Sequence, residues 1–127
     1  MKLRIKGNSL RLRLGRSEVA RLAQGERLEE TVQFTPDDDA TLIYGLEQAS
    51  GIDKMQLRYK PMDVTVLVSD LLVARWAANE QVGLYDSLNL GSGRTLDLLV
   101  EKDFACLDVS DEENVDTFPN PIAGTVC

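Results

Sequence analysis

Apolar and charged residues alternate along the first 14 positions of the chain. Leucine or isoleucine occupies positions 3, 5, 10, 12 and 14, and lysine or arginine occupies positions 2, 4, 6, 11 and 13. A period of two is typical of a half-buried β-strand, and Gly7, Asn8 and Ser9 supply turn residues between the two runs. The pattern therefore predicts a β-hairpin with one apolar face and one basic face.

The spacing of apolar residues then changes to that of a helix. Val19, Leu22 and Ala23 fall on one helical face, which predicts a short helix that begins at Arg16 or Ser17. Gly25 is suited to the left-handed conformation that ends many helices. Two further strands are expected at about 27–34 and 41–47, joined by a turn at 36–39.

The second half of the chain repeats this pattern at an offset of 54 residues. Without a gap, twelve identities are found over positions 1–49, and the longest match pairs 19–23 with 73–77. The second helix has Ser69 as its expected N-cap, buries Trp76 and ends at Asn79, which we expect to be left-handed like Gly25. Its following strands are expected at 82–90 and 94–101. We predict a single domain, residues 1–127, with repeat 1 at about 1–49, repeat 2 at about 55–103 and a C-terminal strap at 104–127.

The predicted fold class is α+β, a tandem duplication of a strand-strand-helix-strand-strand unit. Eight mostly antiparallel strands would form a barrel or a half-closed pair of sheets, with two short helices on the outside, because closure removes exposed sheet edges. The expected core residues are Leu3, Leu10, Leu12, Leu42, Tyr44, Leu57, Val64, Leu96 and Leu98.

Composition limits the chemistry. Histidine is absent from the 127 residues, which excludes His-dependent triads and His-ligated metal or haem sites. No apolar run is long enough for a membrane span, and the charged start does not resemble a signal peptide. With only two cysteines, a disulfide-built secreted scaffold is not expected, and we predict a cytoplasmic protein.

The net charge of −7 is unevenly distributed. Residues 1–21 contain seven bases and one acid, a net charge of +6, whereas six acids and no base follow Lys102. A net acidic domain is not expected to bind nucleic acid. The acidic tail is either solvated or folds back onto the basic hairpin, with Phe104, Leu107 and Phe118 as apolar anchors.

The charged strand positions form the candidate ligand site. The face opposite the core carries six bases and four acids: Arg4, Lys6, Arg11, Arg13, Arg58, Lys60, Glu29, Glu47, Asp97 and Glu101. If a barrel closes with this face inward, the bases would line a tunnel suited to phosphate or carboxylate groups. The alternative is a solvated face with cross-strand ion pairs. The predicted ligand-binding residues are Arg4, Lys6, Arg11, Arg13, Arg58, Lys60, Glu47 and Glu101.

Two resemblances accompany this pattern. The duplicated strands and charged alternation resemble the CYTH-type triphosphate tunnel proteins, which implies metal-dependent polyphosphate chemistry, although the first strand here has Lys2, Arg4 and Lys6 where that family alternates two glutamates and a lysine. The start Lys-Leu-Arg-Ile-Lys-Gly-Asn-Ser and the end Glu-Lys-Asp-Phe-Ala-Cys-Leu with Phe-Pro-Asn-Pro resemble a family of small uncharacterised bacterial proteins. That second resemblance implies no function.

No metal site is predicted. Asp97, Glu101 and Asp103 share one strand face and are able to hold magnesium, or they pair with the basic hairpin. Cys106 and Cys127 lack the spacing of a metal motif. No catalytic residue and no cofactor are assigned. We expect a binding module for a small anionic ligand; a protein-interaction domain and a metal-dependent triphosphate hydrolase acting through Glu47 and Glu101 are the alternatives.

Overall fold

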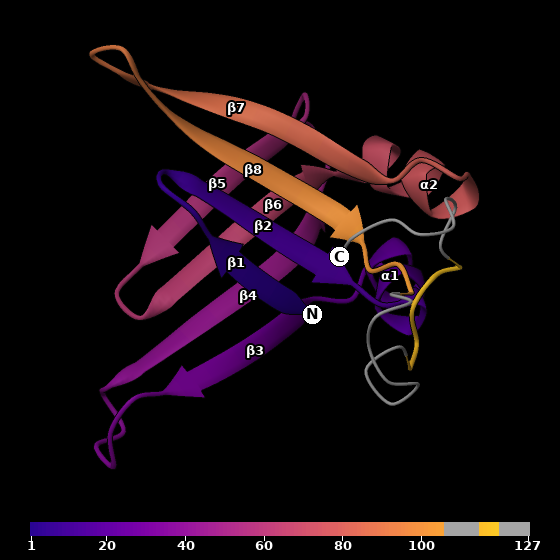
Figure 1. Cartoon of the computed structure of the whole chain (residues 1–127). Coiled ribbons are helices and arrows are strands. Elements are labelled where there is room, and N and C mark those ends of the chain that lie inside the picture. Colours follow the sequence, from indigo (N-terminus) through magenta and orange to yellow (C-terminus); the bar gives the residue numbers. More distant parts are fainter. Residues whose placement is uncertain (106–114, 120–127) are drawn as a thin grey trace.

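The computed structural model describes residues 1–105 and 115–119. Each half of the chain contributes two hairpins with a helix between them (Figure 1). The first half contains β1 (Lys2–Ile5), β2 (Ser9–Leu14), α1 (Arg16–Ala23), β3 (Leu28–Gln33) and β4 (Thr41–Ala49). The second half contains β5 (Met55–Lys60), β6 (Asp63–Ser69), α2 (Asp70–Ala78), β7 (Gly83–Gly91) and β8 (Arg94–Lys102). The predicted α+β class, the eight strands and the two short helices are confirmed.

The strands form two sheets, each built from both halves of the chain. Sheet A has the order β1-β2-β8-β7, and sheet B has the order β3-β4-β6-β5. The hairpins are antiparallel, but the central pairs β2–β8 and β4–β6 are parallel, so both sheets are mixed. The predicted barrel is not confirmed, because the described strands form two separate four-stranded sheets.

The strand registers follow the sequence offset of 54. Ser9 lies opposite Asp97 in sheet A, and the corresponding Asp63 lies opposite Ile43 in sheet B. The halves differ at β7, because Leu84 rather than Val82 takes the position of Leu28 in its sheet. The second half therefore has two extra residues between α2 and β7 and two fewer in the following turn. The sheets are related by an approximate twofold axis that exchanges the two halves.

The apolar core lies between the two sheets and under the helices. Leu12 and Leu98 of sheet A pack in one cluster with Leu46 and Val66 of sheet B and with Trp76 of α2. β2 leads into α1 and β6 leads into α2, and the two helices contact each other and occupy one end of the sandwich (Figure 1). The helices therefore close one end of the core instead of covering the outside of a barrel. The four hairpin tips lie at the opposite end.

The two helices end in different ways. Gly25 follows α1 with a φ of +94° and donates its N–H to the carbonyl of Leu22, as predicted. Asn79 has an extended backbone with a φ of −130°, so the expected left-handed end is wrong for α2. Ser69 stands at the N-cap of α2, but its side chain makes no capping hydrogen bond.

The described part of the C-terminal strap lies at the helix end. The backbones of Phe104 and Phe118 pair in an isolated parallel β-bridge, and their ring centroids are 6.0 Å apart. Phe118 also faces the Lys102 ammonium at 5.3 Å, and Asp116 contacts the start of α1. The expected anchors Phe104 and Phe118 thus do pack, whereas Leu107, Cys106, Cys127 and the acids 108–113 lie outside the described residues. One ion pair joins the described acids after Lys102 to the basic hairpin. In this pair Asp103 Oδ2 lies 2.8 Å from Lys2 Nζ.

Neither described helix is long and apolar enough to cross a membrane.

Candidate functional site

The eight predicted ligand-binding residues lie on the outer faces of two different sheets. Their strand neighbours, such as Leu12 and Val66, point into the core, so the alternating charged residues point outward. Sheet A carries Arg4, Lys6, Arg11, Arg13 and Glu101 on or beside its strands, and sheet B carries Arg58, Lys60 and Glu47. The space between the sheets is filled by apolar side chains, so the charged residues do not line a common tunnel in the described structure.

Ion pairs neutralise the outer face of sheet B. Arg27 Nη1 donates to Glu47 Oε2 at 3.0 Å and to the Thr65 hydroxyl at 3.1 Å. Arg27 Nη2 lies 3.5 Å from Asp63 Oδ2, and Arg58 Nη2 donates to the same Glu47 oxygen. Two arginines therefore face two carboxylates, and little cationic charge is left for a ligand around Arg58.

Gly45 makes room for this network. A Cβ at Gly45 would lie 2.5 Å from the Arg27 guanidinium, so the arginine crosses β4 where no side chain stands. The expected strand at 27–34 included Arg27, but sequence reasoning did not count it among the charged face residues, and in the structure it directly precedes β3. The equivalent residue in the second half is not an arginine, so the sequence repeat did not point to Arg27 either.

The outer face of sheet A keeps unpaired bases. Arg4 lies directly opposite Arg11 in the β1–β2 hairpin, and both side chains line the same small pocket. Arg11 Nε contacts Glu101 Oε1 at 3.0 Å. Within the described residues, Arg4, Lys6 and Arg13 form no ion pair. Adjacent like charges without partners are unfavourable. A bound anion would relieve this repulsion, so the outer face of the hairpin is a candidate anion site.

A small pocket lies among these bases. It has a volume of about 110 Å³ and is lined by Arg4, Lys6, Ser9, Arg11 and Leu99. A water molecule takes up roughly 30 Å³ of the liquid, so the pocket has room for about four waters or for one oxyanion group. The Ser9 hydroxyl donates to the Lys6 carbonyl at 2.6 Å, so its hydrogen is already used. The other polar side chains that line the pocket are the cationic Arg4, Lys6 and Arg11. We name these residues the basic pocket.

A hydrogen bond between Tyr85 and Glu101 borders the basic pocket. The Tyr85 hydroxyl donates to Glu101 Oε2 at 2.9 Å, while the other oxygen of Glu101 receives Arg11. Gly83 leaves space for this contact, since a Cβ there would lie 2.9 Å from Tyr85 Oη. Glu101 thus holds Arg11 through its Nε at the edge of the basic pocket.

The Tyr85 phenol should be one of the last groups to ionise. Burial, then the hydrogen bond to Glu101 and the charge of Glu101, raise the pKa of Tyr85 from 10.0 to about 12. A raised pKa for an acid means that the folded protein holds the proton longer than the unfolded chain. Its contribution to stability is complete below pH 10 and is lost as the pH rises from 10 to 12.

We expect ultraviolet absorbance of the phenolates to show Tyr85 titrating near pH 12. Tyr85→Phe should remove that highest transition and lower the free energy of unfolding by about 1 kcal/mol, the usual net value of one hydrogen bond. Tyr59→Phe is the matched control, since Tyr59 is exposed and its hydroxyl forms no hydrogen bond within the described residues. A Tyr85→Phe protein that keeps the transition near pH 12 would contradict the assignment.

The three carboxylates considered for magnesium have separate partners. Asp97 accepts from the Ser87 hydroxyl at 2.8 Å, Glu101 binds Arg11 and Tyr85, and Asp103 pairs with Lys2. In the part of the chain that the structure describes, no three metal-ligating side chains gather at one place. The interpretation as partners of the basic hairpin fits Glu101 and Asp103.

Comparison with known proteins places the chain in a family. The model of a family of unknown function, DUF7009, matches residues 1–122. The chain belongs to the DUF7009 family. The match covers both repeats of this DUF7009 protein and most of the strap, in agreement with the expected membership of an uncharacterised family. No curated protein and no solved structure matches the chain, so the resemblance to CYTH-type proteins finds no support there.

Proposed function

We propose that this DUF7009 protein binds a small anion through the basic pocket. The observation that carries the proposal is the pairing of Arg4 with Arg11 beside Lys6, with no ion pair to Arg4 or Lys6 in the described residues. Guanidinium groups bind phosphate and carboxylate oxygens in bidentate geometry. The size of the pocket favours a single oxyanion group, such as the terminal phosphate of a phosphate ester, over a whole nucleotide.

The proposal narrows the set of binding residues. Arg4, Lys6 and Arg11 contact the anion, and Arg13, which follows on the same face, contributes to the positive potential. Arg58, Lys60 and Glu47 belong to the outer face of sheet B and take no part. Glu101 is a positioning residue, because it holds Arg11 through Nε. A cytoplasmic location is part of the same proposal.

A triphosphate hydrolase receives less support from the geometry. Glu47 and Glu101, the equivalent acids proposed for such a reaction, stand on the outer faces of different sheets. Each also accepts hydrogen bonds or ion pairs from two neighbouring side chains. They do not share a site at which both would reach one ligand.

The test compares two arginines at equivalent positions of the repeat. Arg4→Ala should weaken the binding of inorganic phosphate or tripolyphosphate by about 10- to 100-fold, because a hydrogen bond to a charged group contributes roughly 1.5–3 kcal/mol. Arg58→Ala, at the corresponding position of sheet B, should leave the affinity unchanged. Isothermal titration calorimetry at low and moderate salt measures both, and ligand-induced rises in melting temperature provide an independent readout.

Two results would refute the proposal. One is the absence of a heat signal and of a thermal shift with either anion at millimolar concentration. The other is an equal loss of affinity in Arg4→Ala and Arg58→Ala, which would indicate a nonspecific response to net charge.

A further inference from the structure

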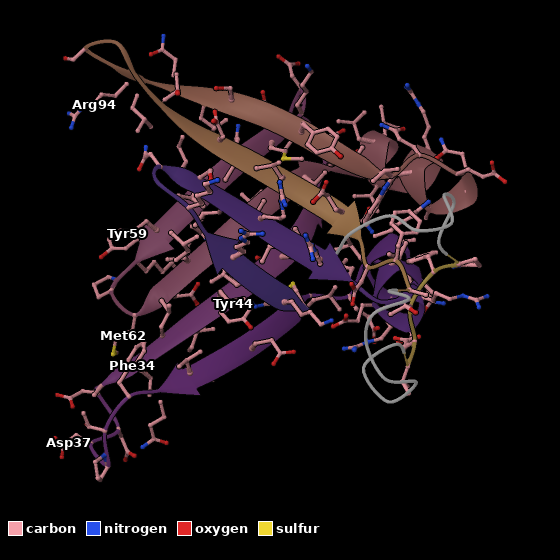
Figure 2. The ribbon with its side chains drawn as sticks, viewed as in Figure 1. Phe34, Asp37, Tyr44, Tyr59, Met62 and Arg94 are labelled. Atoms are coloured by element: carbon pink, nitrogen blue, oxygen red, sulfur yellow. The ribbon has the colours of Figure 1, made fainter. Side chains whose placement is uncertain are left out.

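Large apolar side chains are exposed at the hairpin-tip end of the sandwich. One of them lies at or near the tip-side end of each edge strand: Ile5 in β1, Phe34 after β3, Tyr59 in β5 and Leu90 in β7. Their exposed fractions are 62%, 65%, 72% and 52%, and Met62 and Val32 beside them are exposed by 45% and 39%. We call this surface the tip end. Figure 2 shows Phe34, Tyr59 and Met62 on it, away from the helices.

These side chains continue the inner face of the sheets. Ile5 lies opposite Leu10 and Tyr59 opposite Val64, and both of those partners line the apolar space between the sheets. At the other end of the sandwich the same space is covered by α1 and α2. Among the described residues, no helix covers the tip end. Apolar side chains on the inner face of the sheets are therefore exposed to solvent there.

The exposed positions are equivalent in the two halves of the chain. Ile5 corresponds to Tyr59 at the offset of 54. The offset of 56 that relates β3 to β7 as far as Gln33 and Asn89 aligns Phe34 with Leu90, which lies at the register shift between Asn89 and Gly91. The approximate twofold axis therefore passes through the tip end. A single exposed apolar residue is ordinary on a protein surface, but the tip end exposes one at or near the end of each of the four edge strands.

The charges around the patch complement each other. The β3–β4 tip carries Asp37, Asp38 and Asp39, and the other three tips carry Lys6, Lys60 and Arg94. None of these six forms an ion pair within the described part of the chain. Asp37 and Arg94 lie at the ends of different projecting hairpins in Figure 2. A surface with three acids on one tip and three bases on the others suits a second copy of itself.

We propose that the tip end is the interface of a homodimer. Two copies facing tip end to tip end bury the exposed apolar side chains against each other and place the acidic β3–β4 tip of each copy beside basic tips of the other. Such an isologous contact uses each complementary pair twice. The tri-aspartate loop disfavours the other partner that an apolar and basic surface suits, an anionic membrane, because its charge repels acidic lipids. The residues that carry this inference are separate from the basic pocket except for Lys6, which belongs to both.

Sedimentation velocity of the full chain tests the interface over roughly 1 μM to 1 mM, the range of ordinary weak to moderate affinities. We expect a concentration-dependent dimer, and a rise of at least tenfold in its Kd for Phe34→Asp and for Tyr59→Asp. Leu71→Asp is the matched control, since Leu71 is 66% exposed but lies on α2 at the other end. Circular dichroism verifies that each variant is folded, and Phe34→Ala serves where the aspartate variant is not.

Charge reversal gives a second, independent readout. Changing Asp37, Asp38 and Asp39 together to Lys should weaken the dimer, and adding Lys60→Glu and Arg94→Glu in the same chain should restore it. Lys6 is left unchanged because it belongs to the basic pocket. A monomer throughout the concentration range overturns the proposal, as does a dimer that Leu71→Asp weakens as much as Phe34→Asp does.

Discussion

Replacing Trp76 by alanine is expected to lower the free energy of unfolding by about 3–5 kcal/mol, the range for removing a buried large aromatic side chain. Trp76 is fully buried in α2, where the two helices close the sandwich, and the Lys102 ammonium lies 5.6 Å from its ring centre. Alanine would leave a cavity among Val73, Leu22 and their neighbours in the same core cluster. Because small domains have stabilities of roughly 5–15 kcal/mol, this single change removes a large part of the total.

Urea unfolding followed by far-ultraviolet circular dichroism measures the effect, since the variant has no tryptophan for fluorescence. Trp76→Phe should cost less, because the indole N–H has no hydrogen-bond partner in the described structure and phenylalanine loses no satisfied donor. Leu71→Ala on the exposed side of the same helix is the control and should change stability by less than about 0.5 kcal/mol. Equal losses for Trp76→Ala and Leu71→Ala would show that α2 does not pack as described.

The second large effect is expected at Asp116, which joins the strap to the first helix. Its carbonyl accepts the Arg16 N–H at 2.7 Å, and its carboxylate accepts the Ser17 N–H and the Ser17 hydroxyl. Asp116 thus caps α1 from a distant part of the chain, although Gly15 occupies the N-cap position. Asp116→Ala should cost about 0.5–2 kcal/mol, as the loss of a helix cap does.

The pH dependence of stability identifies the same contact. The hydrogen bonds from the Ser17 hydroxyl and from its backbone N–H hold the pKa of Asp116 below the ordinary value of 3.8 for an aspartate. The carboxylate therefore contributes stability above about pH 4, and this contribution is lost as the pH falls through the lowered pKa. Thermal melts of the wild type and Asp116→Ala should converge in acid. Asp116→Asn keeps one acceptor and should lie between the two.

Gly15→Ala tests the contact from the helix side. A Cβ at Gly15 would lie 2.5 Å from Asp116 Oδ2 and 2.8 Å from its backbone oxygen, so the strap must move away. We expect a loss similar to that of Asp116→Ala and little additional loss when the two changes are combined. Additive losses would indicate that Gly15 and Asp116 act on different parts of the molecule.

Much of the local structure was predictable because it follows from short-range patterns. The alternation at residues 2–14 predicted the first hairpin, and the helical spacing of Val19 and Leu22 predicted α1. The expected strands at 41–47 and 94–101 lie within the observed β4 (Thr41–Ala49) and β8 (Arg94–Lys102). The prediction for Asn79 was wrong because its propensity for the left-handed conformation is weak, and the two extra residues before β7 require an extended chain there.

The candidate site was predictable in its residue types but not in its grouping. Alternation places charged residues on the face opposite the core, whichever sheet a strand joins. It cannot tell that Arg4 and Arg11 share sheet A while Arg58 joins Glu47 in sheet B. Arg27, which neutralises Glu47 across Gly45, was invisible to periodicity for the same reason, because its role depends on strands distant in sequence.

The sequence by itself determined the repeated ββαββ units, the apolar face of every hairpin and the basic character of the first one, because these depend on side chains a few residues apart. Only the tertiary structure decided that the halves exchange hairpins to form two mixed sheets. This arrangement leaves Arg4 and Arg13 on sheet A without an ion pair among the described residues, whereas Arg58 on sheet B pairs with Glu47. Local alternation creates two equivalent charged faces. The pairing of distant strands then makes them different, since each base is balanced or left free by residues that another part of the chain brings beside it.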